Sequence, residues 1–227
     1  EVGAAASDGR LTELPRFGQK TADNIRKSIA FLRQASAYRL AHHAADEART
    51  LVEALGRVPG VLSATAAGEG RRQSEVVKDL VVVLVAEVPA AEIFARLGQV
   101  AGVHEFAGQD ERHVTLRFVG GTSAQIIVTP PLNAGAVLVQ ATGSDAHLRQ
   151  LEARATREGC SLRGAALWRG SEFVPTPDEE ALYRALGLAW IPPELREGGQ
   201  EIDTAATGAI PTLLEAGDLR GFLHCHT

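Results

Sequence analysis

The sequence predicts an α/β fold, and two changes in the spacing of its apolar residues carry this prediction. Before residue 58 the apolar side chains recur every three or four positions, which is typical of amphipathic helices. Between residues 58 and 129 they gather into short runs, which are typical of strands. After residue 132, helical and short strand-like segments are mixed. We therefore expect helices first, then a sheet, and then a smaller mixed part.

Two helices are expected at the start of the chain. A turn and a helix fall within residues 11–34, and a second helix runs from about residue 38 to residue 55. Both have apolar residues at helical spacing: Ala22, Ile25, Ile29 and Leu32 in the first, and Leu40, Ala44, Ala48, Leu51 and Leu55 in the second.

Three strands and one helix are expected in the middle of the chain. The runs VVVLVAEV (81–88), HVTLRFV (113–119) and AQIIVTP (124–130) have the composition of strands. The segment AAEIFARLGQV (90–100) predicts a helix between the first two strands, and GGTS (120–123) predicts a hairpin turn between the last two.

Composition excludes several classes of protein. With 227 residues, 45% of them hydrophobic, the chain can bury a sizeable core as one large domain or two small ones. Its apolar runs are far shorter than the ~20 residues of a membrane span, and no signal peptide is visible, so no membrane contact is expected. Two cysteines are too few for a disulfide framework, which favours the cytoplasm. The net charge of -5 leaves only local basic patches for binding DNA.

Five segments follow one another in the order found in one protein family. They are LPRFGQKTADNI, GEGRR with KDLVVVLVAEV, ATGSDAH, PDEEALYRALGLAWIPPELREGGQEID and DLRGFLHCHT. Together they cover nearly the whole chain, and YRALGLAWIPPELREG is the most specific of them. The chain resembles the bacterial family-X DNA polymerases, relatives of DNA polymerase beta that carry a C-terminal PHP nuclease domain.

The resemblance implies four parts. Residues 1–38 would form a helix-hairpin-helix segment, the end of a DNA-binding helical domain, and residues 39–132 a nucleotidyltransferase palm with a mixed sheet flanked by helices. Residues 133–200 would form a small α/β subdomain that closes on the incoming nucleotide. Residues 201–227 would form a linker and the start of the PHP nuclease domain.

The first motif predicts contact with the DNA backbone. In the turn and helix of FGQKT, Gly18 and Thr21 would lie where backbone N–H groups meet a phosphate, and Lys20 and Lys27 would supply a positive local field. Arg16 stands where the resemblance implies a second glycine. The alternative is an ordinary helix-turn-helix packing unit.

The resemblance implies a metal site at the strand that follows residue 79. Members of the family carry acids at the positions of residues 79, 81 and 125, which hold two Mg²⁺ or Mn²⁺ ions against the nucleotide phosphates. This chain has Asp79, Val81 and Gln125. Asp79 is then a remnant of the catalytic metal ligands, because one carboxylate does not easily hold two such ions. The alternative is an aspartate that opens a strand, and neither Glu69 nor Glu75 has the spacing to lie beside it on that strand.

The nucleotide-binding residues are kept in part. Gly68, Arg71, Arg72, Gly143 and Ser144 match turns that bind the nucleotide in the family, and they are also explained as turn structure. Other positions depart from the pattern: Glu69 replaces a phosphate-binding serine, Gln140 and Ala141 an aromatic pair, Leu148 an asparagine, and Glu152 an arginine. Each departure removes a contact, so a nucleotide is a doubtful ligand.

Two histidines close the chain as an HxH pair. His224 and His226 resemble the first ligand pair of the PHP metal cluster, which would bind Mn²⁺ or Zn²⁺. Two histidines do not complete such a site, so further ligands would lie beyond residue 227. The alternative is a pair of exposed histidines.

Two functions fit this pattern, and the missing acids favour the first. The first is a DNA-repair protein of the family whose polymerase site is impaired or inactive, and which binds gapped or primer-template DNA and positions an attached PHP 3′-5′ exonuclease. The second is an active repair polymerase that uses Mg²⁺ or Mn²⁺ in a rearranged site. An α/β domain with neither role is a third interpretation.

Overall fold

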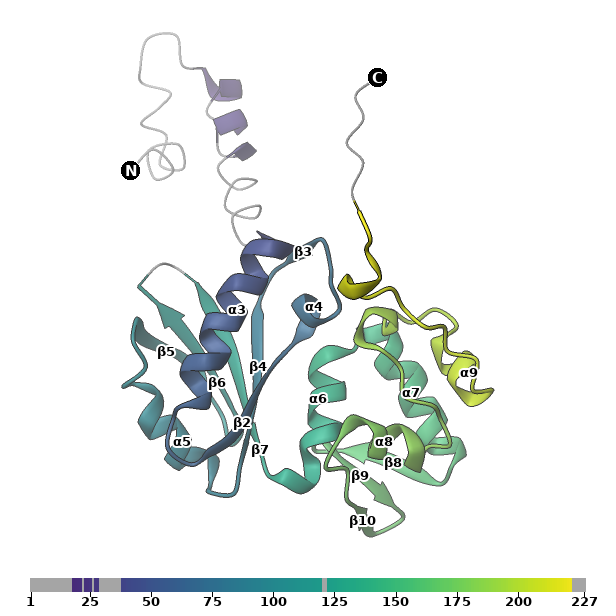
Figure 1. The fold of residues 1–227 in the computed structure, drawn as a ribbon. Helices are drawn as coiled ribbons and strands as arrows, with labels where there is room; N and C mark the ends of the chain where they lie inside the picture. The colour runs from purple at the N-terminus through teal and green to yellow at the C-terminus, as the bar shows by residue number, and fades with distance from the viewer. Residues whose placement is uncertain (1–17, 22, 26, 29–37, 120–121, 222–227) are drawn as a thin grey trace, which may run out of the picture. The chain divides into compact units, whose positions relative to one another are not determined.

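The computed structural model describes residues 18–21, 23–25, 27–28, 38–119 and 122–221, and it confirms the α/β class (Figure 1). The chain divides into two compact units at Pro131 and Leu132. In the described part of the chain, no helix is long and apolar enough to cross a membrane.

The first unit is built on a mixed five-stranded sheet. Its strands are β2 (Val61–Ala67), β4 (Leu80–Ala86), β7 (Ser123–Thr129), β6 (His113–Phe118) and β5 (Val103–Gln109), in the spatial order β2-β4-β7-β6-β5. The central pair, β4 and β7, is parallel, and the other pairs are antiparallel. The parallel pair is explained by the long connection between its strands, which includes α5 (Ala90–Leu97).

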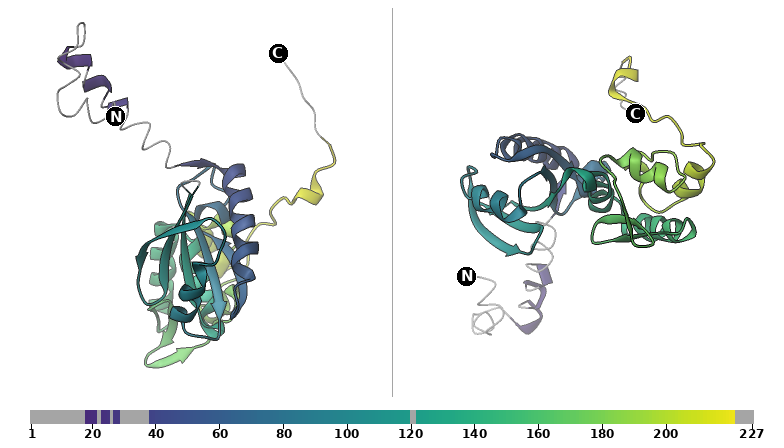
Figure 2. Two further views of the ribbon diagram at one scale, coloured as in Figure 1. Left: turned by 90° about the vertical axis from the view of Figure 1, so that its left-hand side faces the viewer. Right: turned by 90° about the horizontal axis from the view of Figure 1, so that it is seen from below.

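The two faces of this sheet differ because side chains alternate along each strand. Leu80, Val82, Leu84 and Ala86 of β4 point into the core, where they meet α3 (Ala41–Gly56) and α5. Figure 2 shows α3 lying along one side of the sheet. Val81 lies on the opposite face, where its cross-strand partners are Ala67 on β2 and Gln125 on β7. The site inferred from sequence therefore belongs to the face turned away from the core.

The second helix begins later than the sequence predicts. Residues 39–40 form β1 (Arg39–Leu40), which pairs antiparallel with β3 (Val76–Val77), and α3 starts at Ala41. The Arg39 side chain reinforces this pairing, since it donates to the Lys78 carbonyl and forms an ion pair with Glu47 at 3.0 Å.

Two strands of the sheet were not predicted. β2 and β5 are the edge strands, and their residues are mostly small, polar or exposed, so neither shows a continuous apolar run. The turn between β5 and β6 is organised by Asp110, whose carboxylate accepts the N–H groups of Arg112 and His113 at 2.8 Å each. These bonds hold the pKa of Asp110 at about 2. At the predicted GGTS hairpin, Phe118 N–H donates to the Thr122 carbonyl, and residues 120–121 lie outside the described residues.

The second unit combines helices with a small antiparallel sheet. α6 (Ala134–Thr142) and α7 (Asp145–Arg157) precede β8 (Cys160–Arg163), β9 (Ala166–Arg169) and β10 (Glu172–Val174), and α8 (Glu179–Ala185) and α9 (Glu201–Ala206) follow. Among the described residues after β7 there are also three short 3₁₀ helices, η2 (Pro131–Asn133), η3 (Pro193–Leu195) and η4 (Ala216–Asp218). Apolar residues of α6, α7, α8 and the sheet form a separate core.

Candidate functional site

The entry to β4 brings together the three positions at which the resemblance implies acids. Asp79 lies directly before the strand and is half-buried. Val81 is the direct partner of Gln125 in the parallel pair of β4 and β7. The row continues with Ala67 on β2 and Thr115 on β6. Asp79 supplies the one carboxylate at the three implied positions, and Gln125 supplies a neutral amide.

Glu69 also lies at this strand entry, which its spacing did not suggest. It belongs to α4 (Gly68–Arg71), a single turn that follows β2, and its Oε2 accepts the backbone N–H of Lys78 at 2.8 Å. The Glu69 carboxylate thus binds the backbone of the residue directly before Asp79, although Glu69 itself belongs to α4 and not to the strand. No pattern in the sequence indicates this contact, because it depends on how the loop from residue 68 to residue 78 closes.

An open cavity of about 410 Å³ lies beside the strand entry. Its walls come from α3, β2, α4 and the start of β4, and they are mostly alanine and valine. The charged side chains in the lining are those of Arg49, Arg71 and Asp79. Gly68 is buried with φ of +72°, a conformation that favours glycine, so it is required by the turn itself. The cavity therefore combines two cations and one anion with an apolar floor, and Arg49 is a lining residue that the sequence analysis did not identify.

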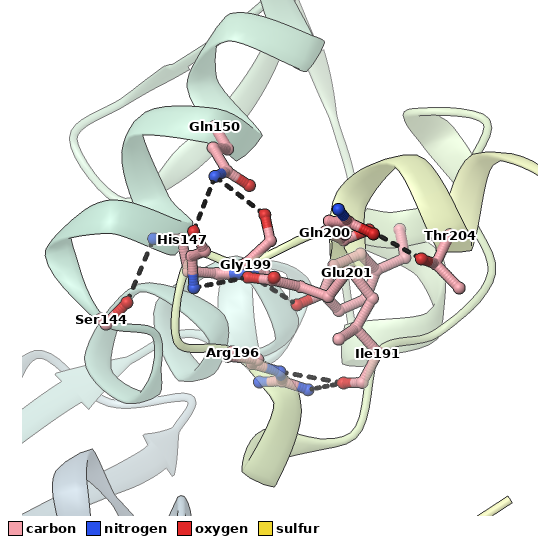
Figure 3. Close-up of polar contacts among 11 residues, drawn as sticks. Ser144, His147, Gln150, Ile191, Arg196, Gly199, Gln200, Glu201 and Thr204 are labelled. Atoms are coloured by element: carbon pink, nitrogen blue, oxygen red, sulfur yellow. Dashed lines mark hydrogen bonds and ion pairs between the residues drawn. The ribbon is translucent and has the colours of Figure 1, made fainter. Parts of the chain in front are cut away.

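Gly143 and Ser144, predicted as nucleotide-binding residues, have structural roles in the second unit. Ser144 is the N-cap of α7, where its Oγ accepts the His147 N–H at 3.1 Å (Figure 3). The N–H of Ser144 donates to the Arg196 carbonyl at 3.0 Å. A Cβ on Gly143 would lie 2.8 Å from Cδ2 of His147. Both residues are thus explained by packing and capping.

A buried polar network surrounds His147, which is fully buried. Its Nδ1 lies 2.8 Å from Glu201 Oε1, and its Nε2 lies 3.1 Å from the Tyr183 hydroxyl. The same Glu201 oxygen accepts the Gly198 N–H at 2.8 Å. Burial alone raises the pKa of the Glu201 carboxyl, but the hydrogen bonds from His147 and from backbone N–H groups outweigh it, so that pKa lies below its usual value.

Arg196 anchors the other side of this network. Its guanidinium is fully buried and makes two hydrogen bonds to the Glu179 carboxylate, with ion-pair atoms 2.6 Å apart. It also donates to the Ile191 carbonyl (Figure 3). The guanidinium lies over the Tyr183 ring at 5.3 Å from its centroid. In the segment that is most specific in sequence, YRALGLAWIPPELREG, the residues Tyr183, Ile191 and Arg196 are therefore explained by buried contacts.

Arg72, another predicted nucleotide-binding residue, is the C-cap of α4. The other predicted residues lie in the terminal parts of the chain. Gly18, Lys20, Thr21 and Lys27 are exposed, residues 19–21 and 27–28 are helical, and Thr21 N–H donates to the Gly18 carbonyl at 3.0 Å. His224 and His226 lie outside the described residues. Within the described ranges, no three His, Cys, Asp or Glu side chains are grouped so as to hold a metal ion.

Two comparisons find similarity to known proteins, one in the second unit and one along nearly the whole chain. Residues 137–197 match the family described as "DNA polymerase beta thumb". Over 228 residues the chain is 28% identical to "DNA polymerase/3'-5' exonuclease PolX" of Bacillus subtilis (strain 168). That alignment covers 98% of this chain and 39% of the relative, so the chain spans about two fifths of the relative's length.

Proposed function

We propose that this chain, a member of the bacterial family-X DNA polymerases, binds DNA and positions an attached nuclease, while its own site for nucleotidyl transfer is impaired. The whole protein would act in DNA repair in the cytoplasm. The observation that carries the proposal is the pairing of Val81 with Gln125 beside Asp79.

The donor set at β4 does not fit a pair of divalent cations. Two such ions need several oxygen ligands with negative charge, because Mg²⁺ is held by carboxylates together with substrate phosphates. Val81 offers no donor, and the amide of Gln125 offers an oxygen without charge or basicity. Asp79, alone of the three, would hold a Mg²⁺ or Mn²⁺ ion weakly.

The surroundings of Asp79 support the same conclusion. The Glu69 carboxylate would face the phosphates of a nucleotide bound at the turn where the family has a serine, so it would repel them. In the structure, Oε2 of Glu69 accepts a hydrogen bond from the backbone N–H of Lys78. A nucleotide would therefore bind weakly at Gly68, Arg71 and Arg72. At Gly143 and Ser144 a nucleotide would compete with the hydrogen bond that caps α7.

The nuclease partner is proposed from the printed name of the relative and from the HxH pair. The relative is named as both a DNA polymerase and a 3'-5' exonuclease, and this chain spans 39% of it. We infer that His224 and His226 join later ligands in a PHP site for Mn²⁺ or Zn²⁺.

The deciding experiment is primer extension across a one-nucleotide gap. We expect the chain to be at least ~10³-fold slower than a relative with all three acids, since the lost charge stabilisation is worth several kcal/mol. The matched variant is Val81→Asp with Gln125→Asp, which restores the acids and should raise the rate. Asp79→Ala should change the low rate of the parent chain little.

The second candidate function is an active polymerase with a rearranged metal site, and the Glu69 carboxylate at the strand entry is the observation in its favour. Fast extension with Mn²⁺ that is lost in Asp79→Ala and in Glu69→Gln would establish it and overturn the impaired site.

A further inference from the structure

The small sheet of the second unit has two different faces. Leu167 pairs with Leu162 and Val174, and all three lie in or against the core of the unit. Trp168 pairs with Ser161 on one side and with Phe173 on the other. Because neighbouring residues of a strand point to opposite faces, Trp168 and Phe173 stand on the face turned away from that core.

Three side chains on this outer face are held together. The Trp168 and Phe173 rings meet edge to face, with centroids 5.7 Å apart. The Arg163 guanidinium lies over the Trp168 ring at 5.6 Å from its centroid. Nη2 of Arg163 donates to the Gly170 carbonyl at 3.0 Å, and Nε1 of Trp168 donates to the Arg163 carbonyl at 3.3 Å. These bonds tie both side chains to the hairpin, so the arrangement is formed before any ligand arrives.

The charge of this cluster suits a polyanion. Arg163 is exposed, and among the described residues no carboxylate lies within ion-pair distance of it. Its observed partners are a carbonyl and an aromatic ring, which leave its positive charge uncompensated. Aromatic rings and guanidinium planes on a sheet surface are the groups on which unpaired bases stack, while the cation meets the phosphodiester.

We propose that Arg163, Trp168 and Phe173 form a stacking platform for unpaired bases of single-stranded DNA, separate from the strand entry of the first unit. The platform rests on the proposed DNA binding, and it adds a preference for the unpaired strand of a gap or overhang. Stacking is tolerant of sequence because every base has a π face, so no base preference is expected.

Tryptophan fluorescence tests the platform directly. The chain has two tryptophans, Trp168 and Trp190, so Trp190→Phe leaves Trp168 as the reporter and Trp168→Phe leaves Trp190. Binding of oligo(dT) should quench the emission of the first variant and leave that of the second unchanged. The mononucleotide dTMP at the same nucleotide concentration should quench neither, and equal quenching by dTMP would overturn the assignment to a strand.

Affinities measured by anisotropy with a labelled oligo(dT) complete the test. Trp168→Ala and Arg163→Ala should each weaken binding by about 5-fold to 100-fold, since one stacked base contributes that much. The matched control is Arg169→Ala, an exposed arginine on the other face of the same strand, which should stay within about twofold. Melting temperatures of the variants verify that each one is folded.

The two proposals fail in different ways. DNA binding with unquenched Trp168 and unchanged affinities in Trp168→Ala and Arg163→Ala would overturn the platform and leave the proposed function standing. No binding of single-stranded or gapped DNA at any salt concentration would overturn both.

Discussion

At the scale of single residues, Arg196 and Glu179 show why one segment of this sequence is so specific. Their ion pair is buried, and the guanidinium also meets the Ile191 carbonyl and the Tyr183 ring. A buried charge is tolerated only while its partner is present, because the remaining ion would be desolvated without compensation. Arg196 and its buried partners therefore depend on one another. The fold alone restricts which residues this segment can contain, whether or not the segment contacts DNA.

Replacing Glu179 by glutamine tests this dependence. Glu179→Gln keeps the shape of the side chain and leaves Arg196 charged and buried, so the free energy of unfolding should fall by about 3–5 kcal/mol. The neighbouring Glu180 is exposed, and Glu180→Gln should change stability by less than about 0.5 kcal/mol. Urea unfolding of both variants gives the comparison, and equal stabilities would show that the pair contributes nothing.

The pH dependence of stability should contain a contribution from Glu201. Its pKa is lower in the folded chain than its usual value, so the folded state binds this proton less readily than the unfolded state. The stabilisation is therefore complete above the usual glutamate pKa and is lost as pH falls through the lowered folded value.

Melting temperatures measured from neutral to acidic pH test the role of Glu201. The stability difference between the parent and Glu201→Gln should be largest near neutral pH and should shrink in acid. Asp203→Asn, an exposed change in the same helix, serves as the control. A difference that grows as the solution is acidified would contradict the assignment.

At the scale of elements, the start of α6 approaches the start of α8 through a glycine. Gly135 N–H donates to the Thr176 carbonyl at 2.8 Å, and a Cβ at this position would collide with the Asp178 carbonyl. Asp178 in turn caps α8 by accepting the Ala181 N–H at 2.7 Å. The close approach thus joins α6 to the helix that carries Glu179 and Tyr183.

A methyl group at this contact should separate the two helices. Gly135→Ala is expected to destabilise the second unit by about 1–3 kcal/mol through overpacking, although alanine has the higher helix propensity. Gly217→Ala, where nothing lies within 4 Å of the added Cβ, should be close to neutral. Thermal unfolding of both variants distinguishes them, and a more stable Gly135→Ala would show that the backbone moves apart without loss.

At the scale of the whole molecule, two separate cores lie in a chain of net charge -5. The negative net charge therefore repels the phosphates of DNA, and any binding must come from local cations such as Lys20 and Lys27. Such contacts reach phosphates and carry no sequence information.

DNA binding should accordingly be weak, independent of sequence and steeply dependent on salt. Lys20→Glu with Lys27→Glu should weaken binding to a gapped duplex at least about tenfold and flatten the slope of log affinity against log salt. Arg57→Glu with Arg220→Glu makes the same change in net charge at exposed sites elsewhere and should have a smaller effect. Fluorescence anisotropy over a salt series measures both, and equal effects would mean that the lysines act only through net charge.

The fold class, the central strands and the helices that pack against them could be predicted from the amino-acid sequence. The helices α3 and α5 were predictable because their apolar residues repeat with the helical period, and β4, β6 and β7 because they form short runs with the composition of strands. The three positions 79, 81 and 125 were also found from sequence, through resemblance to a family. The edge strands β2 and β5 were missed because an edge exposes much of its surface and so lacks an apolar signal.

Which residues meet across long stretches of the chain is known only from the tertiary structure. It placed Val81 opposite Gln125, brought the Glu69 carboxylate to the N–H of Lys78, and assigned Ser144 to capping α7. It also joined His147 to Glu201 and set Trp168 beside Phe173 on an outer face. Periodicity describes how one element faces the core, whereas these contacts depend on strand register, loop closure and the alternation of side chains across a sheet, which no local pattern specifies.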